Sequence, residues 1–317
     1  MGENVTTFPP SQMLHSQVPF PVTHNPSFSP GVTTNNPFLS EEEQKIEELE
    51  IQLILEAVHK RYGYDYRQYT QSTIRRRLHH HRERLGCTHL IDMLPRLLRD
   101  EDSFSNLALD LSITVTEMFR DPWVYKALRE KVIPFLKTFP TVRIWHAGCA
   151  TGEEVHSLAI ILKEEGLLDR CVIYATDINP VALNVAKHGL FPIERVKEYT
   201  ANYQKTGGLE PFAEYYRTDG KNVILDRNIR NRISFFQHNL CTDSVFGEMQ
   251  LILCRNVMIY FNQDLQDRVF KLFRDSLAYG GFLCIGSKED IRFSEVEDDF
   301  ETFDSPSKIY KMRRLAY

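Results

Sequence analysis

The stretch Val142-Arg143-Ile144-Trp145-His146-Ala147-Gly148-Cys149-Ala150-Thr151-Gly152-Glu153-Glu154 decides the fold of this chain. Four residues of strand character lead into a loop of small residues, and a helical pattern follows at once over residues 153–165. Residues 171–176 then predict a second strand, which ends on Asp177. This order is typical of open α/β sheets that bind a nucleoside-type cofactor. The glycines let the backbone approach the ligand, and the carboxylate accepts hydrogen bonds from ribose hydroxyls.

The turn itself narrows the class of ligand. It holds only two glycines, Gly148 and Gly152, and the acidic pair Glu153-Glu154 opens the helix. Two carboxylates at a helix N-terminus suit the helix dipole but repel a pyrophosphate, which disfavours a dinucleotide. A nucleoside with a cationic group fits better, and S-adenosylmethionine is such a molecule. On this stretch alone, a plain βαβ unit with a glycine turn and surface glutamates remains an alternative.

Composition excludes several classes of protein. The 317 residues predict two domains, and a formal net charge of −5 argues against a general nucleic-acid binder. The sequence shows neither a run of apolar residues that could span a membrane nor a secretory signal, so we expect no membrane insertion and a cytoplasmic, bacterial protein. Six cysteines without a CxxC pair predict buried, reduced thiols. Consecutive histidines, as in His79-His80-His81, point in different directions on a helix, so we expect no metal site.

Three regions follow from the pattern along the chain. Residues 1–40 hold seven of the fifteen prolines and no Lys or Arg, which predicts a disordered tail. Residues 41–115 predict a small all-helical domain. Its expected helices cover 40–61, 73–85, 90–98 and 102–111, and Ile46, Leu49 and Leu53 are the expected apolar face of the first.

Residues 116–317 alternate between strand and helix patterns, which predicts a mostly parallel sheet covered on both faces. An insertion at about 190–231 interrupts the alternation. We expect Gly280-Gly281 to end the last helix and residues 307–312 to form an edge strand. The expected strands are 142–145, 171–176, 232–237, 250–254 and 281–286, and the expected helices are 122–137, 153–165, 180–187 and 263–279.

Four motifs in a fixed order carry a resemblance to a known family. They are Ser112-Ile113-Thr114-Val115-Thr116-Glu117-Met118-Phe119-Arg120-Asp121, Ala150-Thr151-Gly152-Glu153-Glu154, Ala175-Thr176-Asp177-Ile178-Asn179 and Cys254-Arg255-Asn256-Val257-Met258-Ile259-Tyr260-Phe261. Together they closely resemble the CheR-type methyltransferases, which methylate glutamates on bacterial chemoreceptors. The resemblance covers about residues 45–315. It implies a Rossmann-like S-adenosylmethionine-dependent methyltransferase domain, a small N-terminal all-helical domain and an inserted β-subdomain.

The resemblance also implies roles for single residues in binding S-adenosylmethionine. Arg120 would pair with the methionyl carboxylate, as suits a guanidinium fork, and Glu153 would meet the methionyl amine. Asp177 would hold the ribose, although a helix N-cap before Asn179-Pro180 is an alternative or additional role. Tyr260 is a further candidate for the pocket lining. The remaining cofactor-binding candidates are Thr114 and Thr116 in the loop before the sheet, Asn239 and Leu240 beside the adenine, and Arg255 with Asn256.

The chemistry implied by the resemblance needs no general base, because a glutamate carboxylate is already ionised at neutral pH. The products would be a γ-glutamyl methyl ester and S-adenosylhomocysteine. In the family, the region that corresponds to residues 73–85 docks on the acidic methylation helices of the receptor, which would recruit this protein to membrane receptor arrays. The substrate-docking candidates are Arg75, Arg76, Arg82 and Arg84, and a solvated basic face is the alternative.

Some family members bind a receptor-tail pentapeptide through a glycine-rich loop in the insertion. The corresponding stretch here, residues 215–221, has one glycine, so we expect no such tethering. We expect a monomer whose partner is the cytoplasmic methylation region of chemoreceptors, with no nucleic acid. Two other functions stay open at this point: a methyltransferase of the same fold with a small-molecule substrate, and a non-catalytic module that senses the cofactor or binds a receptor.

Overall fold

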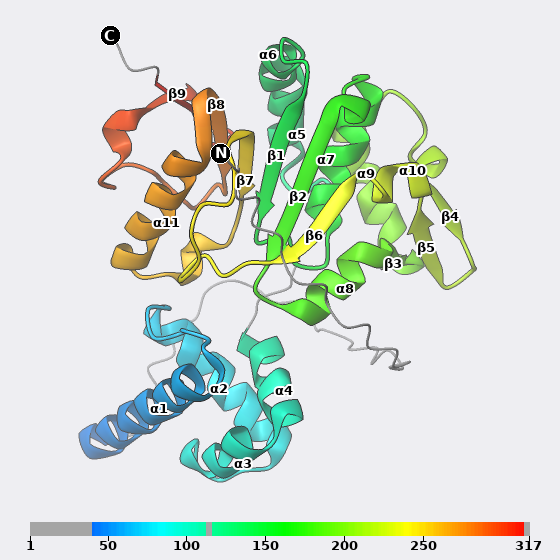
Figure 1. The fold of residues 1–317 in the computed structure, drawn as a ribbon. Coiled ribbons are helices and arrows are strands. Elements are labelled where there is room, and N and C mark those ends of the chain that lie inside the picture. The colour runs from blue at the N-terminus through cyan, green and yellow to red at the C-terminus, as the bar shows by residue number, and fades with distance from the viewer. Residues whose placement is uncertain (1–39, 112–115, 314–317) are drawn as a thin grey trace, which may run out of the picture. The chain divides into compact units, whose positions relative to one another are not determined.

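The computed structural model describes residues 40–111 and 116–313 (Figure 1). The predicted disordered tail, apart from Ser40, and the candidate Thr114 lie outside the described residues. The first domain consists of helices, as expected. They are α1 Glu41–Tyr62, α2 Gln71–Leu85, the short 3-10 helix η1 Ile91–Met93, α3 Leu94–Arg99 and α4 Glu101–Leu111. A capping box begins α1, because Ser40 Oγ accepts from the Glu43 amide while the Glu43 side chain accepts from the Ser40 amide.

The prediction for the inner face of α1 was wrong. Ile46, Leu49 and Leu53 are 54%, 55% and 47% exposed, whereas Ile54 and Val58 are almost fully buried. The core of the helical domain forms around these two residues and around apolar side chains of the other helices, such as Leu78, Met93 and Leu107. An apolar stripe at helical spacing indicates a helix, but it did not identify which side of the first half of α1 would find a partner.

The second domain is built on a seven-stranded sheet with the order β6-β2-β1-β7-β8-β10-β9. The five strands from β6 to β8 are parallel, and β10 pairs antiparallel with both β8 and β9. The strands are β1 Val142–Ala147, β2 Cys171–Asp177, β6 Ile233–Gln237, β7 Met249–Cys254, β8 Leu277–Ile285, β9 Phe300–Asp304 and β10 Ile309–Met312. Strand β1 is the central one of the five parallel strands, with β2 on one side and β7 on the other. The polypeptide therefore leaves β1 for α7 at the point where the strand order reverses, which is where such sheets bind ligands.

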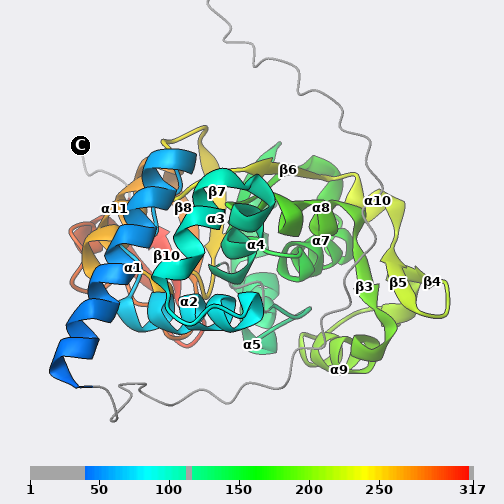
Figure 2. The ribbon, with the colours of Figure 1, turned by 90° about the horizontal axis from the view of Figure 1, so that it is seen from below.

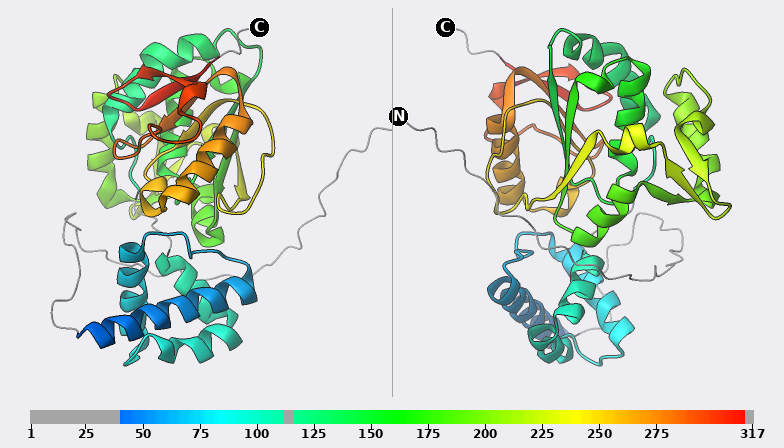
Figure 3. Two further views of the ribbon diagram at one scale, coloured as in Figure 1. Left: turned by 90° about the vertical axis from the view of Figure 1, so that its left-hand side faces the viewer. Right: turned by 45° about the vertical axis from the view of Figure 1, so that its right-hand side comes forward.

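Helices cover both faces of this sheet. Ile144 of β1 packs in one cluster with α7, Glu153–Glu164, whereas its neighbour Trp145 packs in another with α11, Gln263–Ser276. Because successive strand residues face opposite sides, α7 and α11 lie on opposite faces, as Figures 1 and 3 show. On the α7 side lie also α5 Pro122–Ala127, a π-helical turn Leu128–Val132, α6 Ile133–Leu136 and α8 Pro180–His188.

The predicted insertion is a small subdomain (Figure 2). Its three-stranded antiparallel sheet has the order β3-β5-β4, with β3 Leu190–Pro192, β4 Tyr216–Thr218 and β5 Asn222–Leu225. Helices α9 Val196–Lys205 and α10 Arg227–Arg230 accompany it. Glu164, at the end of α7, connects the subdomain to the rest of the α/β domain. Its carboxylate accepts from the hydroxyls of Tyr203 and Tyr215 and from the Leu209 amide of the subdomain. It also accepts from Arg129, which lies outside the subdomain.

The C-terminal third departs from the prediction in two places. Helix α11 ends at Ser276, before the predicted 279, and Gly280-Gly281 lie inside β8 rather than at a helix end. Residues 309–312 do form a strand, but β10 lies between β8 and β9, so the edge belongs to β9, which the sequence pattern did not indicate. Among the helices of residues 40–111 and 116–313, none combines the length and apolar character that crossing a bilayer requires.

Candidate cofactor and active site

The turn after β1 requires glycine at both of its glycine positions. A Cβ at Gly148 would lie 2.4 Å from Cγ2 of Val257, and a Cβ at Gly152 would lie 2.8 Å from Cβ of Ala186. Both residues also have positive φ, at 72° and 93°. The amides of Gly148 and Cys149 donate to the carbonyl oxygen of Thr176, at 2.8 and 2.9 Å, so the turn is tied to the end of β2.

Asp177 ends β2 and faces this turn. Its Oδ2 accepts from the Ala150 amide at 2.8 Å, and its Oδ1 accepts from the Asn179 amide at 2.9 Å. Burial raises the pKa of its carboxyl group, although these backbone amides oppose the effect. The N-cap of α8 is Asn179, which accepts from the amides of Val181 and Ala182, so the alternative role of Asp177 as that cap was wrong.

A cavity opens where four parallel strands end. The segments that follow β1, β2, β6 and β7 all contribute to its wall. Seven of the predicted cofactor-binding residues line it: Thr116, Arg120, Asp177, Asn239, Leu240, Arg255 and Asn256. Tyr260, the further candidate, also lines it. The four motifs of the sequence therefore converge on one cavity.

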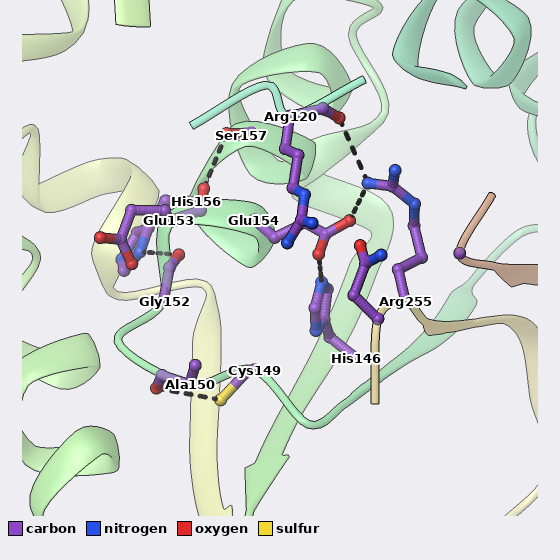
Figure 4. Close-up of polar contacts among 12 residues, drawn as sticks. Arg120, His146, Cys149, Ala150, Gly152, Glu153, Glu154, His156, Ser157 and Arg255 are labelled. Carbon is purple, nitrogen blue, oxygen red and sulfur yellow. Dashed lines mark hydrogen bonds and ion pairs between the residues drawn. The ribbon is translucent and has the colours of Figure 1, made fainter. Parts of the chain in front are cut away.

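Glu153 differs from this pattern, because the cavity wall contains Glu154 in its place. The Glu153 side chain is buried on another side of α7 from Glu154 (Figure 4). There it accepts from Thr151 Oγ1 at 2.6 Å. Burial raises the pKa of its carboxyl group to about 7. Neighbouring residues on a helix point about 100° apart, so only one of two adjacent glutamates at the first turn of α7 can face the ligand.

Glu154 belongs to a buried charge network (Figure 4). Arg255 donates through Nη1 to the Glu154 carboxylate and through Nη2 to Asp121 Oδ2 at 2.6 Å. The same Nη1 donates to the carbonyl oxygen of Arg120 at 3.3 Å, which connects the end of β7 to the second residue before α5. Burial opposes charge on Arg255, yet the neighbouring Glu154 carboxylate raises its pKa overall. Both Nη groups of Arg255 are thus engaged with protein groups, and they orient both the glutamate and the Arg120 segment.

Arg120 is placed differently. Its side chain lines the cavity beside Glu154 (Figure 4), and among the described residues no hydrogen bond or ion pair satisfies its guanidinium group. A charged, partly buried guanidinium without a protein partner is suited to an anionic ligand group. His146, fully buried beneath it, has Nε2 3.9 Å from Glu154 Oε2, and burial lowers the pKa of this histidine, so a neutral ring separates the network from the core.

The turn after β7 depends on a residue that the sequence reasoning missed. Asn256 has φ 60°, and its Oδ1 is buried without a partner in the described part of the chain. The Glu289 carboxylate, itself 5% exposed, accepts from the amides of Asn256 at 3.2 Å, Val257 at 2.9 Å, Met258 at 2.8 Å and Gly286. Glu289 lies in a loop with no motif around it, so no signal in the sequence distinguished it from a surface glutamate.

The helical domain also contributes to the cavity, which the sequence did not indicate. Tyr66, Tyr69 and Leu111 form part of the wall. All described residues fall within one compact unit, and main-chain contacts join the two domains beside the cavity. The Thr70 amide donates to the Tyr260 carbonyl oxygen at 2.8 Å, and Tyr69 forms an isolated antiparallel bridge with Phe261.

The four predicted docking arginines of α2 have different environments. Arg75 pairs with Glu47 at 3.1 Å and Arg84 with Asp110 at 2.7 Å, both within the helical domain. Arg82 approaches only Glu83, at 3.5 Å. Arg76 is exposed, and in residues 40–111 and 116–313 no hydrogen bond or ion pair satisfies it. Arg76 and Arg82 are therefore better placed than Arg75 and Arg84 to meet a partner.

Charged side chains of both domains act on Tyr260. The cations Arg120, Arg77 and Arg76 each lower the pKa of this tyrosine, against the larger opposing effect of burial. One of them comes from the cofactor cavity and two from α2, whereas the Glu289 carboxylate acts in the opposite sense. In the part of the chain that the structure describes, no group of three His, Cys, Asp or Glu residues is arranged to hold a metal ion.

Comparison with known proteins agrees with this architecture. Residues 114–309 match the family described as CheR methyltransferase, SAM binding domain, and residues 49–112 match its all-alpha domain. The chain belongs to the CheR methyltransferase family. Its cofactor is accordingly S-adenosylmethionine, and its fold is the family's helical domain followed by an α/β domain.

Two relatives illustrate the breadth of this family. A Pseudomonas putida protein named putative methyltransferase Cher3 is 47% identical over 264 residues, which is 83% of this chain and 97% of the relative. The chemotaxis protein methyltransferase 1 of Vibrio cholerae is 30% identical, over 70% of this chain and 83% of the relative. The chain is therefore an S-adenosylmethionine-dependent methyltransferase of the chemotaxis methyltransferase family.

The cavity fits the cofactor of this family. Arg120 and the unpartnered Asn256 Oδ1 offer a cation and an acceptor near Glu154, which suits a methionyl group that carries both a carboxylate and an ammonium. Asp177 lies across the glycine turn, where a ribose would be held, and Asn239 with Leu240 follows β6. His238, also in the wall, has a buried Nδ1 without a partner among the described residues. Buried polar atoms of this kind are costly unless a ligand satisfies them.

Proposed function

We propose that this protein transfers the methyl group of S-adenosylmethionine to glutamate side chains in the cytoplasmic methylation region of chemoreceptors, and so tunes receptor signalling. The observation that carries this proposal is a set of cations without protein partners among the described residues, Arg120 in the cavity wall and the exposed Arg76 on α2, which together contribute a positive field. An ionised carboxylate on an acidic helix is the substrate that such a field attracts.

The chemistry places few demands on the protein. The cofactor supplies an electrophilic methyl group on a sulfonium. A carboxylate oxygen forms the new O–CH₃ bond as the S–CH₃ bond breaks, and the electron pair of that bond stays on sulfur, which gives S-adenosylhomocysteine and a glutamate methyl ester. The nucleophile is ionised at neutral pH, so the residues of the cavity need only align it and remove its water.

We assign the cofactor contacts from the cavity geometry. Arg120 pairs with the methionyl carboxylate, and Glu154, rather than Glu153, meets the methionyl amine, because Glu154 faces the cavity. Asp177 accepts from the ribose hydroxyls. The remaining proposed contacts are Thr116, Asn239, Leu240 and Asn256, with Arg255 acting through Glu154 and the Arg120 segment.

The proposed receptor docking is by α2, through Arg76 and Arg82, without a pentapeptide tether. The hairpin turn between β4 and β5 supports the lack of a tether, because its own side chains satisfy its backbone. Asp219 Oδ1 accepts from the amides of Lys221 and Asn222, at 2.9 and 2.6 Å, and Thr218 Oγ1 accepts from the Gly220 amide at 3.0 Å. We further propose that the protein acts as a monomer in the cytoplasm and is recruited to receptor arrays.

The test is transfer of labelled methyl from the cofactor to purified receptor cytoplasmic domains. We expect label that is released as methanol by mild alkali, because the product is a carboxyl ester. Label that resists alkali would mean methylated nitrogen and would refute the glutamate assignment. If every receptor domain stays unlabelled while small acids are methylated, the substrate is a small molecule instead.

A charge reversal tests the docking surface separately. Arg76→Glu should lower kcat/KM for receptor about tenfold at low salt, since one lost charge contact is worth on the order of 1 kcal/mol and the reversal adds repulsion. Affinity for S-adenosylhomocysteine should stay unchanged. Arg96→Glu, an equally drastic change at an exposed position on α3, is the matched control and should have little effect. Equal receptor methylation by both variants would show that α2 is only a solvated face.

A further inference from the structure

We propose that the helical domain completes the cofactor site, and that the Tyr66 hydroxyl hydrogen-bonds the adenosine half of the bound cofactor. The inference concerns cofactor binding only. It can therefore be tested independently of the proposed receptor substrate.

The segment that carries Tyr66 is fixed against the α/β domain. It runs from Gly63, which ends α1 with φ 78°, to the start of α2. The Asn262 amide donates to the Gln68 carbonyl oxygen at 2.9 Å, next to the contact between Thr70 and Tyr260. On the other side, Gln237 Nε2 donates to the Tyr64 hydroxyl at 2.8 Å. The segment is thus held by residues at the ends of β6 and near the end of β7, the same strands whose following turns line the cavity.

Tyr66 occupies the centre of this segment. The residue is 1% exposed and lines the cavity, and its ring meets that of Tyr69 edge to face at 5.3 Å. Its hydroxyl is buried without a hydrogen-bond partner in the described part of the chain. Burying a hydroxyl in this way costs free energy, so an unpaired hydroxyl in a cavity wall points to a ligand that pairs with it.

The neighbours of the hydroxyl show which part of the ligand it would meet. Gln237 Nε2, which donates to the Tyr64 hydroxyl, also donates to the carbonyl oxygen of Ile178 at 3.0 Å, so the segment that carries Tyr66 is held beside the residue that follows Asp177. Cys241 and Asp177 also line the cavity. Asp177 is the proposed ribose acceptor, and Cys241 directly follows Leu240 at the proposed adenine end. We therefore assign the phenol to the nucleoside half of the ligand, and the charged pair Arg120 and Glu154 to the methionyl end.

The chemistry of adenosine suits this position. Ribose oxygens and the base nitrogens can accept a hydrogen bond that the Asp177 carboxylate, an acceptor only, cannot donate. A phenol hydroxyl supplies that missing donor. Its ring also covers apolar surface of the nucleoside, as aromatic side chains with one polar end commonly do in binding sites.

The experiment is calorimetric titration of the full chain with S-adenosylhomocysteine. Tyr66→Phe keeps the ring and removes only the hydroxyl, so we expect affinity to fall about three- to tenfold, as for one neutral hydrogen bond. The thermal midpoint of the protein without ligand should not fall, since the deleted hydroxyl has no protein partner there. 5′-Methylthioadenosine, which keeps the nucleoside and lacks the amino-acid group, should lose affinity by the same factor.

Tyr62→Phe is the matched control. The Tyr62 hydroxyl donates to the Leu97 carbonyl oxygen at 2.6 Å inside the helical domain, so this variant should lower the thermal midpoint and leave the affinity unchanged. Unchanged affinity in Tyr66→Phe would overturn the inference. A loss for S-adenosylhomocysteine but not for 5′-methylthioadenosine would overturn the nucleoside assignment, and a lowered midpoint in Tyr66→Phe without ligand would mean that the hydroxyl serves the fold.

Discussion

Glu289→Gln should be among the most damaging single substitutions in the chain, although Glu289 belongs to no recognised motif. Each oxygen of its carboxylate accepts two backbone amides: Oε1 those of Val257 and Met258, and Oε2 those of Asn256 and Gly286. The glutamine amide has the same shape but presents NH₂ in place of one oxygen. In either orientation, that NH₂ faces two backbone donors that no longer have an acceptor.

The expected loss follows from those two amides. A hydrogen bond to a charged group contributes about 1.5–3 kcal/mol net, so losing two costs about 3–6 kcal/mol before the loop relaxes. Relaxation is limited, because a Cβ on the neighbouring Gly286 would already lie 2.7 Å from the Asn256 amide nitrogen, which shows how closely the two loops pack. We expect a decrease of about 3 kcal/mol in the free energy of unfolding. Because Asn256 lies in the cavity wall, affinity for S-adenosylhomocysteine should fall about tenfold as well.

Urea unfolding and calorimetric titration measure the two effects. Glu295→Gln is the control, because Glu295 only pairs with Lys271 at the surface, so its loss should cost less than about 1 kcal/mol. A Glu289→Gln protein within about 1 kcal/mol of wild type, with the cofactor affinity intact, would refute the reasoning. It would mean that the turn after β7 keeps its positive φ at Asn256 without this carboxylate.

Two further predictions concern the acidic residues of the glycine turn. Asp177→Ala should weaken S-adenosylhomocysteine binding at least tenfold, since a charged hydrogen bond worth about 1.5–3 kcal/mol is lost, whereas Asp219→Ala in the β4–β5 turn should not; calorimetry that finds equal affinities would contradict this. Glu153 has its folded pKa raised to about 7 from an ordinary value of 4.5, so the folded state keeps a proton that the unfolded chain has lost between these values. The free energy of unfolding should therefore fall as pH rises through this window, by at most about 1.4 kcal/mol per pH unit. Urea unfolding at several pH values should show a smaller slope of this free energy against pH in Glu153→Gln. Identical slopes in the two proteins would rule this out.

The parts of the fold set by local pattern could be predicted from the sequence. Strand β1, the turn after it, helix α7 and strand β2 lie where the pattern placed them, because β-branched and aromatic runs, glycines of positive φ and helical periodicity all act over short distances. Strand β9 was missed, since Phe300-Glu301-Thr302-Phe303-Asp304 is short, polar and at a sheet edge. Gly280-Gly281 was interpreted as a helix end, but a strand whose neighbour approaches closely also uses glycine.

The candidate site could be predicted only as far as its motifs reach. The choice between Glu153 and Glu154 depends on the rotation of α7 against the sheet, which one residue of helix phase decides. The acceptor role of Glu289 depends on where a loop after β8 returns to the turn after β7. Tyr66 and Tyr69 reach the cavity because two domains meet there. These contacts join residues far apart in the chain, and a pattern within a single sequence carries no information about them.

The Gly63–Thr70 segment and α2 are consecutive in the chain, so one short stretch serves both the cofactor cavity and the proposed receptor-docking helix. Linkage then sets a rule for the two binding events. If occupancy of the cavity favours one position of this stretch, a receptor that binds α2 in that position must raise the affinity for the cofactor, and the cofactor must raise the affinity for the receptor by the same factor. S-Adenosylmethionine and S-adenosylhomocysteine share the adenosine half that meets Tyr66. Both would therefore raise the affinity for the receptor, and release of S-adenosylhomocysteine would lower it.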